Sequence, residues 1–188
     1  MAESRVGITQ LTAEDLPFLV ELWHIPDVMR YADEFPKLRG WHKSMAPGAA
    51  WQAYQARRAE LGASYTQLIL RLNDGAAIGE SFFTPLPEGY TFGRWAKPES
   101  VHALMGDIKL LPAHWGQGLG TEGMRLVAQW AFAQTPCDLL VVPPHRYNPA
   151  AERVYEKTGF VLFTGMRSWH NHKIMELTRQ RFERLYAA

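Results

Sequence analysis

The chain contains a single cysteine, Cys137, among its 188 residues. One thiol cannot form an intrachain disulfide, and it excludes a zinc site built from several cysteines. We therefore expect a reducing, cytoplasmic setting. Cys137 follows Pro136 at the start of a predicted strand, where we expect it to pack as a small apolar residue. An acyl-cysteine mechanism would need an activating base beside it, and the sequence offers none.

The chain also has almost no excess of either charge. Twenty basic and 19 acidic residues leave a formal net charge of +1, so no global field attracts nucleic acid or an anionic membrane. The segment Met1–Gly7 has no apolar core of signal-peptide length, and no later run is long enough to span a membrane. With 47% hydrophobic and 21% charged residues, we expect one soluble globular domain over residues 1–188.

Strand and helix patterns are present in the first half. Arg5–Leu11 alternates apolar and polar residues and predicts a short strand. Thr12 with Asp15 resembles a capping box before a helix whose apolar positions run from Leu16 to Trp23. Further helices are expected at 26–32 and 47–62, with an irregular segment from Phe35 to Met45 between them.

A β-hairpin is the clearest local prediction. Residues 65–72 and 77–84 have strand composition and flank Asn73-Asp74-Gly75. This segment predicts the turn of the hairpin, because Asp-Gly supplies the positive φ values that such a turn needs. Residues 88–103 carry a weaker signal, with one strand expected at 90–95. A further strand over 104–111 ends at Pro112, which cannot donate to a ladder.

The second half predicts one strand–helix–strand unit followed by a helix with clear ends. A helix ends near Gln134, and the apolar run Asp138–Pro143 predicts a buried strand. Asn148 is the expected N-cap of the next helix, with Gly159 just past its end. Closing strands are expected at 160–164 and 173–178, and a helix at 179–186. This order predicts a mixed α/β fold around a mostly antiparallel sheet of six to seven strands.

The segment His114–Met124 holds three glycines in five residues, Gly116, Gly118 and Gly120, and a helical pattern follows at once. Amides of such a loop can bind an anion at a helix N-terminus. With Gly123, the spacing also fits the dinucleotide-binding fingerprint.

Two other interpretations of this loop are open at the sequence level. A Rossmann site requires an acidic residue about twenty positions on, at the end of the second strand, whereas Asp138 begins its strand. Four residues also separate the preceding strand from the loop, and no Gly-Lys-Ser/Thr follows as in a P-loop. In the second interpretation the glycines form only a tight turn, and Tyr155 is a packed aromatic residue.

Two motifs together resemble one enzyme family. The loop Trp115–Thr121 follows strand 104–111, and Asn148-x-x-Ala151-x-x-x-Tyr155-x-x-x-Gly159-Phe160 follows strand 138–143. This arrangement looks like the GCN5-related N-acetyltransferases, in the branch of ribosomal-protein N-terminal and aminoglycoside 6′-N-acetyltransferases. Trp115 stands where Arg or Gln is usual. The resemblance is specific over about 104–163.

The resemblance implies an acetyl-CoA-dependent N-acetyltransferase with splayed strands at the cofactor site. Amides at a helix N-terminus can bind the pyrophosphate of acetyl-CoA without a lysine. In this family the pantetheine runs beside the first of two splayed strands, Asn148 would bond it, and Tyr155 would aim its hydroxyl at the sulfur. The implied cofactor contacts are Ile108, Leu110, Leu111, Gln117, Gly118, Leu119, Gly120, Thr121, Asn148, Ala151 and Tyr155, with no metal.

Three residues are candidates for catalysis. Tyr155 is the candidate general acid that protonates the departing thiolate. Asp107 is the leading candidate for the base or the amine anchor. Glu80, expected on one strand face with Ile78 and Phe82, is the alternative, because a charge on an apolar face needs a partner or a function.

The histidines and acidic residues of the sequence do not identify the acetyl acceptor. His145 lies just past a strand and could relay a proton, whereas His170 and His172 lack a third metal ligand. The resemblance implies an acceptor that is either a small aminoglycoside-like amine or a protein N-terminus. We expect no nucleic-acid or membrane partner. A homodimer is left open as an expectation. The alternative function is a non-catalytic CoA- or nucleotide-binding protein. An acidic cleft for a polycation would draw on Asp27, Asp33, Glu34, Glu88 and Glu99.

Overall fold

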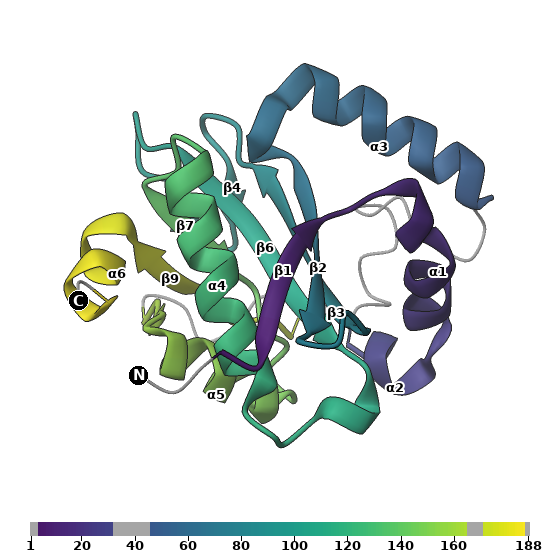
Figure 1. The fold of residues 1–188 in the computed structure, drawn as a ribbon. Coiled ribbons are helices and arrows are strands. Elements are labelled where there is room, and N and C mark those ends of the chain that lie inside the picture. The colour runs from purple at the N-terminus through teal and green to yellow at the C-terminus, as the bar shows by residue number, and fades with distance from the viewer. Residues whose placement is uncertain (1–3, 32–45, 165–170, 187–188) are drawn as a thin grey trace.

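A seven-stranded sheet forms the centre of the protein in the computed structural model, which describes residues 4–31, 46–164 and 171–186 (Figure 1). The expected irregular segment Phe35–Met45 lies outside these residues, as do Asp33, Glu34 and His170. All neighbouring strands of the sheet are antiparallel except β6 and β7. In spatial order the strands are β1 (Val6–Gln10), β2 (Thr66–Leu72), β3 (Ala77–Pro85), β6 (Ala103–Leu110), β7 (Leu139–Val142), β9 (Met175–Thr178) and β8 (Val161–Leu162).

Helices cover both faces of this sheet. On one face Met124 and Val127 of α4 pack in a buried cluster with Leu68 of β2. On the other, Leu22 of α1 packs in a cluster with Ile69 of β2. The helices are α1 (Leu16–His24), α2 (Pro26–Met29), α3 (Pro47–Leu61), α4 (Leu119–Gln134), α5 (Pro149–Thr158) and α6 (Arg179–Tyr186).

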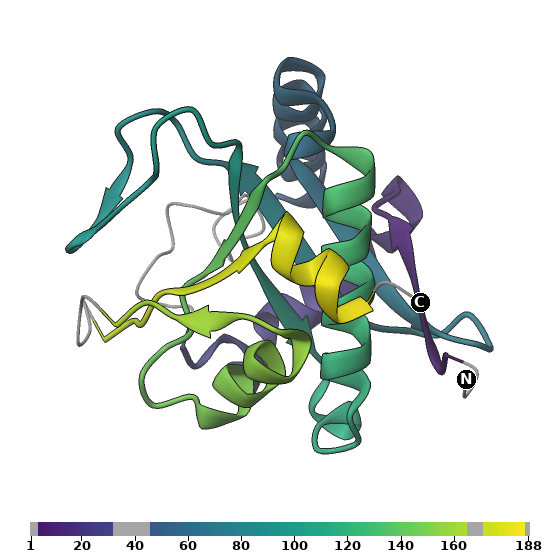
Figure 2. The same cartoon turned by 90° about the vertical axis from the view of Figure 1, so that its left-hand side faces the viewer.

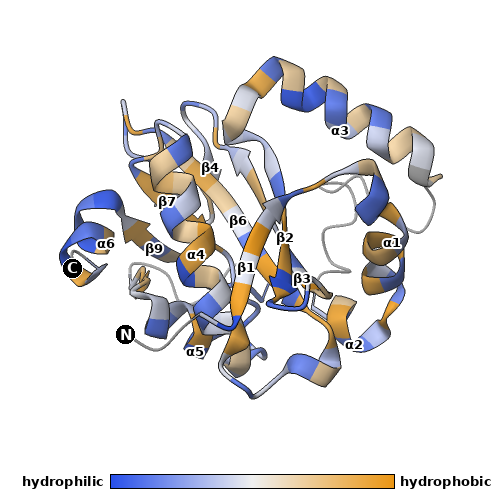
Figure 3. Ribbon diagram, in the orientation of Figure 1, coloured by the Kyte–Doolittle hydropathy of each residue, from blue (hydrophilic) through white to orange (hydrophobic). Residues whose placement is uncertain are grey.

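The mixed α/β class predicted from the sequence is confirmed. β6, α4 and β7 form the expected strand–helix–strand unit with parallel strands. The short α6 is mostly hydrophilic in Figure 3 and buries Phe182. Within the parts of the chain that the structure describes, no helix has the length and apolar character needed to cross a membrane.

The hairpin between β2 and β3 is confirmed, but its turn differs from the predicted one. Gly75 has a φ of 88°, whereas Asp74 is not in the left-handed region. Gly75 N–H donates to the Leu72 carbonyl at 2.9 Å, and the Asp74 carboxylate accepts from Ala76 N–H at 3.0 Å. A single left-handed glycine therefore closes the turn, with the aspartate bonding the backbone two residues on.

A β-bulge in β3 decides which residues face the site. Leu70 pairs with Gly79 but Arg71 pairs with Ala77, so Ile78 has no opposite residue on β2. Ile78 packs in a buried cluster with Leu119 of α4, while Glu80 lies two residues on and opposite Lys109. The expectation that Ile78 and Glu80 share a face is therefore wrong, because a bulge breaks the alternation of side chains.

Two short strands replace the single strand expected at 90–95. β4 (Thr91–Phe92) and β5 (Trp95–Ala96) pair antiparallel in a second small sheet, which projects beyond the main one (Figure 2). Phe92 and Trp95 are buried in a cluster with Leu139 of β7. Aromatic packing on the main sheet thus holds a segment that has little regular pairing of its own.

Gly79→Ala should lower the free energy of unfolding by about 1 to 3 kcal/mol, the usual cost of overpacking. A Cβ at position 79 would overlap the Lys109 carbonyl oxygen and lie 2.8 Å from Leu110 Cδ2. Urea denaturation measures the change, with Gly7→Ala in β1 as the control because a Cβ there meets nothing within 4 Å. Equal denaturation midpoints for the two variants would contradict the expectation.

Candidate active site

The strands β6 and β7 separate where the family resemblance implies a cofactor. Only residues 103–105 of β6 pair with residues 139–141 of β7. β6 continues to Leu110, whereas β7 ends at Val142. An opening between the two strands begins after Met105, which confirms the expected splayed strands.

The backbone of β6 presents hydrogen-bonding groups to this opening. Leu86 N–H donates to the Ala103 carbonyl at 2.9 Å, and bonding groups alternate sides along an antiparallel strand. The odd-numbered residues of β6 therefore bond β3. Gly106, Ile108 and Leu110 direct their N–H and C=O groups toward β7 and, past the last paired residues, into the opening.

Some backbone groups at the end of β6 already have hydrogen-bond partners within the protein. Trp115 Nε1 donates to the Leu110 carbonyl at 2.8 Å. Leu111 N–H donates to the Ile78 carbonyl at 2.8 Å, and the Leu111 carbonyl accepts from His114 N–H at 2.9 Å. Both backbone groups of Leu111 are thus engaged, so Ile108 and the amide of Leu110 are the predicted backbone contacts best placed to meet a ligand.

The glycine loop leads directly into α4. Gly118 is the N-cap, with a φ of 82° that favours glycine, and its carbonyl accepts from Thr121 and Glu122 N–H at 3.1 Å. Among the described residues no acceptor is assigned to Leu119 or Gly120 N–H, the first two amides of the helix. These amides and the helix dipole are the groups that the predicted anion site would use.

The other two fingerprint glycines pack α4 closely. A Cβ at Gly120 would lie 3.1 Å from Leu110 Cδ1 and 3.3 Å from Val154 Cγ2. At Gly123 it would overlap Leu70 Cδ2. The third glycine of the apparent dinucleotide fingerprint is therefore explained by packing of α4 on β2, and a mostly antiparallel sheet does not suit a Rossmann site.

The caps predicted for α5 are confirmed. Asn148 is the N-cap, and its Oδ1 accepts from Ala151 N–H at 3.1 Å, while left-handed Gly159 ends the helix. The cap uses the oxygen of Asn148, so the amide nitrogen is the group left to donate to a ligand. Tyr155 is only 3% exposed, with its ring 5.5 Å from that of Phe160.

The two predicted carboxylates are brought together by a lysine. Lys109 Nζ lies 3.0 Å from Glu80 Oε1 and 2.6 Å from Asp107 Oδ2. Gln67 Nε2 donates to Glu80 Oε2 at 3.0 Å, and Lys109 Nζ lies 4.8 Å from the centre of the Trp23 ring. We call Gln67, Glu80, Asp107 and Lys109 the carboxylate cluster; it lies on the α1 side of the sheet.

Exposure separates the two carboxylates. Glu80 is fully buried, with both oxygens bonded, whereas the side chain of Asp107 is 15% exposed. Two carboxylates and one ammonium leave a formal charge of −1 in the carboxylate cluster. Asp107 is therefore the more exposed of the two carboxylates.

A buried histidine pair lies at the ends of β7 and β9. His145 Nδ1 accepts from Tyr147 N–H at 3.2 Å, and its ring stacks 4.9 Å from that of Tyr31. His172 lies opposite His145 in an isolated bridge, with ring centres 5.1 Å apart. Among the residues that the structure describes, no three side chains are grouped to hold a metal ion.

Cys137 packs as the sequence predicts. It belongs to the buried cluster beneath α4. Burial raises the pKa of its thiol to about 12. The thiol therefore stays protonated near neutral pH and does not serve as an acyl carrier.

Comparison with known protein families identifies the family to which this chain belongs. The model of the acetyltransferase (GNAT) domain matches residues 5–161, a span that includes β6, the glycine loop and α5. The chain belongs to the GNAT acetyltransferase family. It is an N-acetyltransferase that uses acetyl-CoA, as the motifs at Gly118 and Asn148 predict.

Solved GNAT structures share the fold over nearly the full length of the chain. The aminoglycoside acetyltransferase AAC(6')-Ib in complex with coenzyme A superposes with a TM-score of 0.72 at 23% identity, covering 95% of this chain and 98% of that one. Spermidine N-acetyltransferase from Vibrio cholerae, in complex with CoA and spermine, gives 0.71 at 16% identity, covering 96% and 99%.

The GNAT site fits acetyl-CoA on its own geometry. A left-handed glycine opens a helix whose first two amides have no acceptor within the described part of the chain, and β6 separates from β7 beside it. Asp107 and Tyr155 lie on opposite sides of the sheet. Sequence reasoning missed Lys109 and Gln67, although the i+2 spacing of Asp107 and Lys109 places them on one strand face.

Proposed function

We propose that this enzyme acetylates a primary amine of a small cationic molecule. The carboxylate cluster carries this proposal, because it places a net negative charge beside the opening between β6 and β7. The structures of AAC(6')-Ib with ribostamycin and of spermidine N-acetyltransferase with spermine support a small-amine acceptor. A protein N-terminus is the alternative acceptor. A cytoplasmic setting, supported by the lone buried cysteine, is part of the proposal, and a homodimer stays a prediction.

The glycine loop and the opening would hold acetyl-CoA. Amides of residues 117–121 would bind the pyrophosphate, with Leu119 and Gly120 at the helix start. The β6 groups of Ile108 and Leu110 would hydrogen-bond the pantetheine as an added strand would. Asn148 would donate to the same arm, with Ala151 beside it on α5.

The side chains divide the acid–base work. Acetyl-CoA, when bound, supplies an activated acetyl thioester. An ammonium is not nucleophilic, so the acceptor must lose a proton before it attacks. Asp107 would anchor the amine and is the candidate to take its proton. Tyr155 would donate a proton to the departing thiolate. Glu80 receives a supporting role, because Lys109 and Gln67 occupy its oxygens.

The test is thiol release from acetyl-CoA over a panel of amines, with Tyr155→Phe alongside. Spermidine, an aminoglycoside and a short peptide with a free N-terminus represent the acceptor classes. We expect turnover with a polycationic amine and a decrease of about 10- to 100-fold in Tyr155→Phe, the low end for a general acid because a thiolate is a good leaving group.

Two results would contradict the proposal. Binding of acetyl-CoA without turnover on any amine would favour the non-catalytic interpretation. Turnover of the peptide alone would move the acceptor to protein N-termini. Unchanged turnover in Tyr155→Phe would remove the acid role from Tyr155 but leave the reaction class standing.

A further inference from the structure

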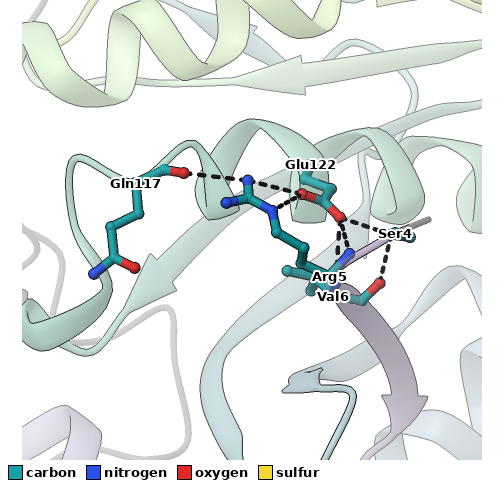
Figure 4. Close-up of polar contacts among 5 residues, drawn as sticks. All are labelled: Ser4, Arg5, Val6, Gln117 and Glu122. Carbon is teal, nitrogen blue, oxygen red and sulfur yellow. Dashed lines mark hydrogen bonds and ion pairs between the residues drawn. The ribbon is translucent and has the colours of Figure 1, made fainter. Parts of the chain in front are cut away.

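The N-terminal strand is tied to the first turn of α4 by one carboxylate (Figure 4). Glu122 accepts from Ser4 Oγ at 2.8 Å, from the backbone N–H of Arg5 and from that of Val6 at 3.3 Å. The Arg5 guanidinium donates to Glu122 through Nε at 3.2 Å and Nη2 at 3.1 Å. Nη2 also donates to the Gln117 carbonyl at 3.2 Å, within the glycine loop.

The negative charge of Glu122 would repel an anionic ligand at the start of α4. Burial tends to raise the pKa of Glu122, but hydrogen bonds from the N-terminal segment outweigh burial and hold the pKa below its usual range. The carboxylate is therefore ionised near neutral pH. It lies in the helix turn whose amides would bind pyrophosphate, where a second negative charge opposes binding.

Arg5 supplies the compensating charge at that point. Its Nη2 would lie 3.4 Å from a Cβ built on Gly118, so the guanidinium lies against the loop backbone. Its side chain is 58% exposed, so it keeps a face open to solvent and to a ligand. Figure 4 shows it between the Gln117 carbonyl and the Glu122 carboxylate.

We propose that Arg5 is a positioning residue for acetyl-CoA. It fixes the glycine loop through the Gln117 carbonyl and cancels the charge of Glu122 beside the pyrophosphate. The inference rests on the proposed cofactor site, and it assigns part of that site to the residue just before β1. Because the interaction is between charges at the surface, it weakens as salt rises.

Calorimetric titration of coenzyme A tests this, at 50 mM and 300 mM NaCl. We expect Arg5→Met to raise the Kd about tenfold at low salt, the loss expected for one charge-assisted contact, and less at high salt. Arg5→Lys should recover part of the affinity. The double variant Arg5→Met/Glu122→Gln should bind within about threefold of the wild type, because the uncompensated carboxylate is gone.

Arg57→Met is the matched control, since Arg57 also forms an exposed ion pair, with Glu60 on α3. Its Kd should not change, and the KM for the amine should stay constant in all variants. An unchanged Kd in Arg5→Met overturns the inference. A double variant no better than Arg5→Met overturns it too, because the Arg5 effect would then be structural. Wild-type protein that binds no coenzyme A would overturn the proposed function as well.

Discussion

Replacing Lys109 by methionine should lower the free energy of unfolding by about 3 to 5 kcal/mol, the cost of breaking a buried ion pair by removing one partner. Lys109 forms ion pairs with both Glu80 and Asp107, and Glu80 is fully buried. Without the ammonium, two carboxylates on neighbouring strands would face each other with little water to screen them. Urea denaturation followed by tryptophan fluorescence measures the change.

Two variants show whether the loss comes from the charges. Lys157→Met removes an exposed lysine from α5 and should change stability by no more than about 0.5 kcal/mol. The double variant Lys109→Met/Glu80→Gln should be more stable than Lys109→Met alone, because it buries one uncompensated charge fewer. A double variant no more stable than the single one would contradict the charge explanation.

The parts that the sequence predicted correctly are those determined by local chemistry. Asp15 accepts from Thr12 N–H at 2.9 Å, and Asn148 caps α5, as the residue types and spacing require. Such contacts span three residues, so a short stretch of sequence contains both partners. The glycine loop belongs to the same class, because Gly118 and the helix after it are adjacent in the chain.

The parts that were missed depend on register between distant strands. Ile78 was misplaced because the bulge lies in the pairing of β3 with β2, which the sequence of β3 alone does not show. Lys109 meets Glu80 through the register of β3 with β6, which no short window of sequence specifies. The β4–β5 sheet was missed for a related reason, since its stability comes from burial of Phe92 and Trp95.

Asp107→Asn should lower kcat/KM for the amine about 100-fold while leaving the Kd for coenzyme A unchanged. Loss of a charge-assisted contact to an ammonium accounts for about 10- to 100-fold, and loss of a general base for about 10²- to 10⁴-fold. Asn keeps the shape and one acceptor oxygen but removes the charge. Initial rates over a range of amine concentrations separate the two roles.

The division between KM and kcat decides which role Asp107 has. Lys109 already neutralises part of the charge of Asp107, and the side chain of Asp107 is partly exposed. We therefore expect Asp107→Asn to act mainly by raising the KM for the amine, as for an anchor. A loss confined to kcat would instead make proton transfer, and not anchoring, the main role of Asp107. Asp138→Asn, which alters an exposed carboxylate at the start of β7, is the control and should keep both constants. If Asp107→Asn also kept both, the acceptor would bind elsewhere, and the carboxylate cluster would be a structural feature of the sheet.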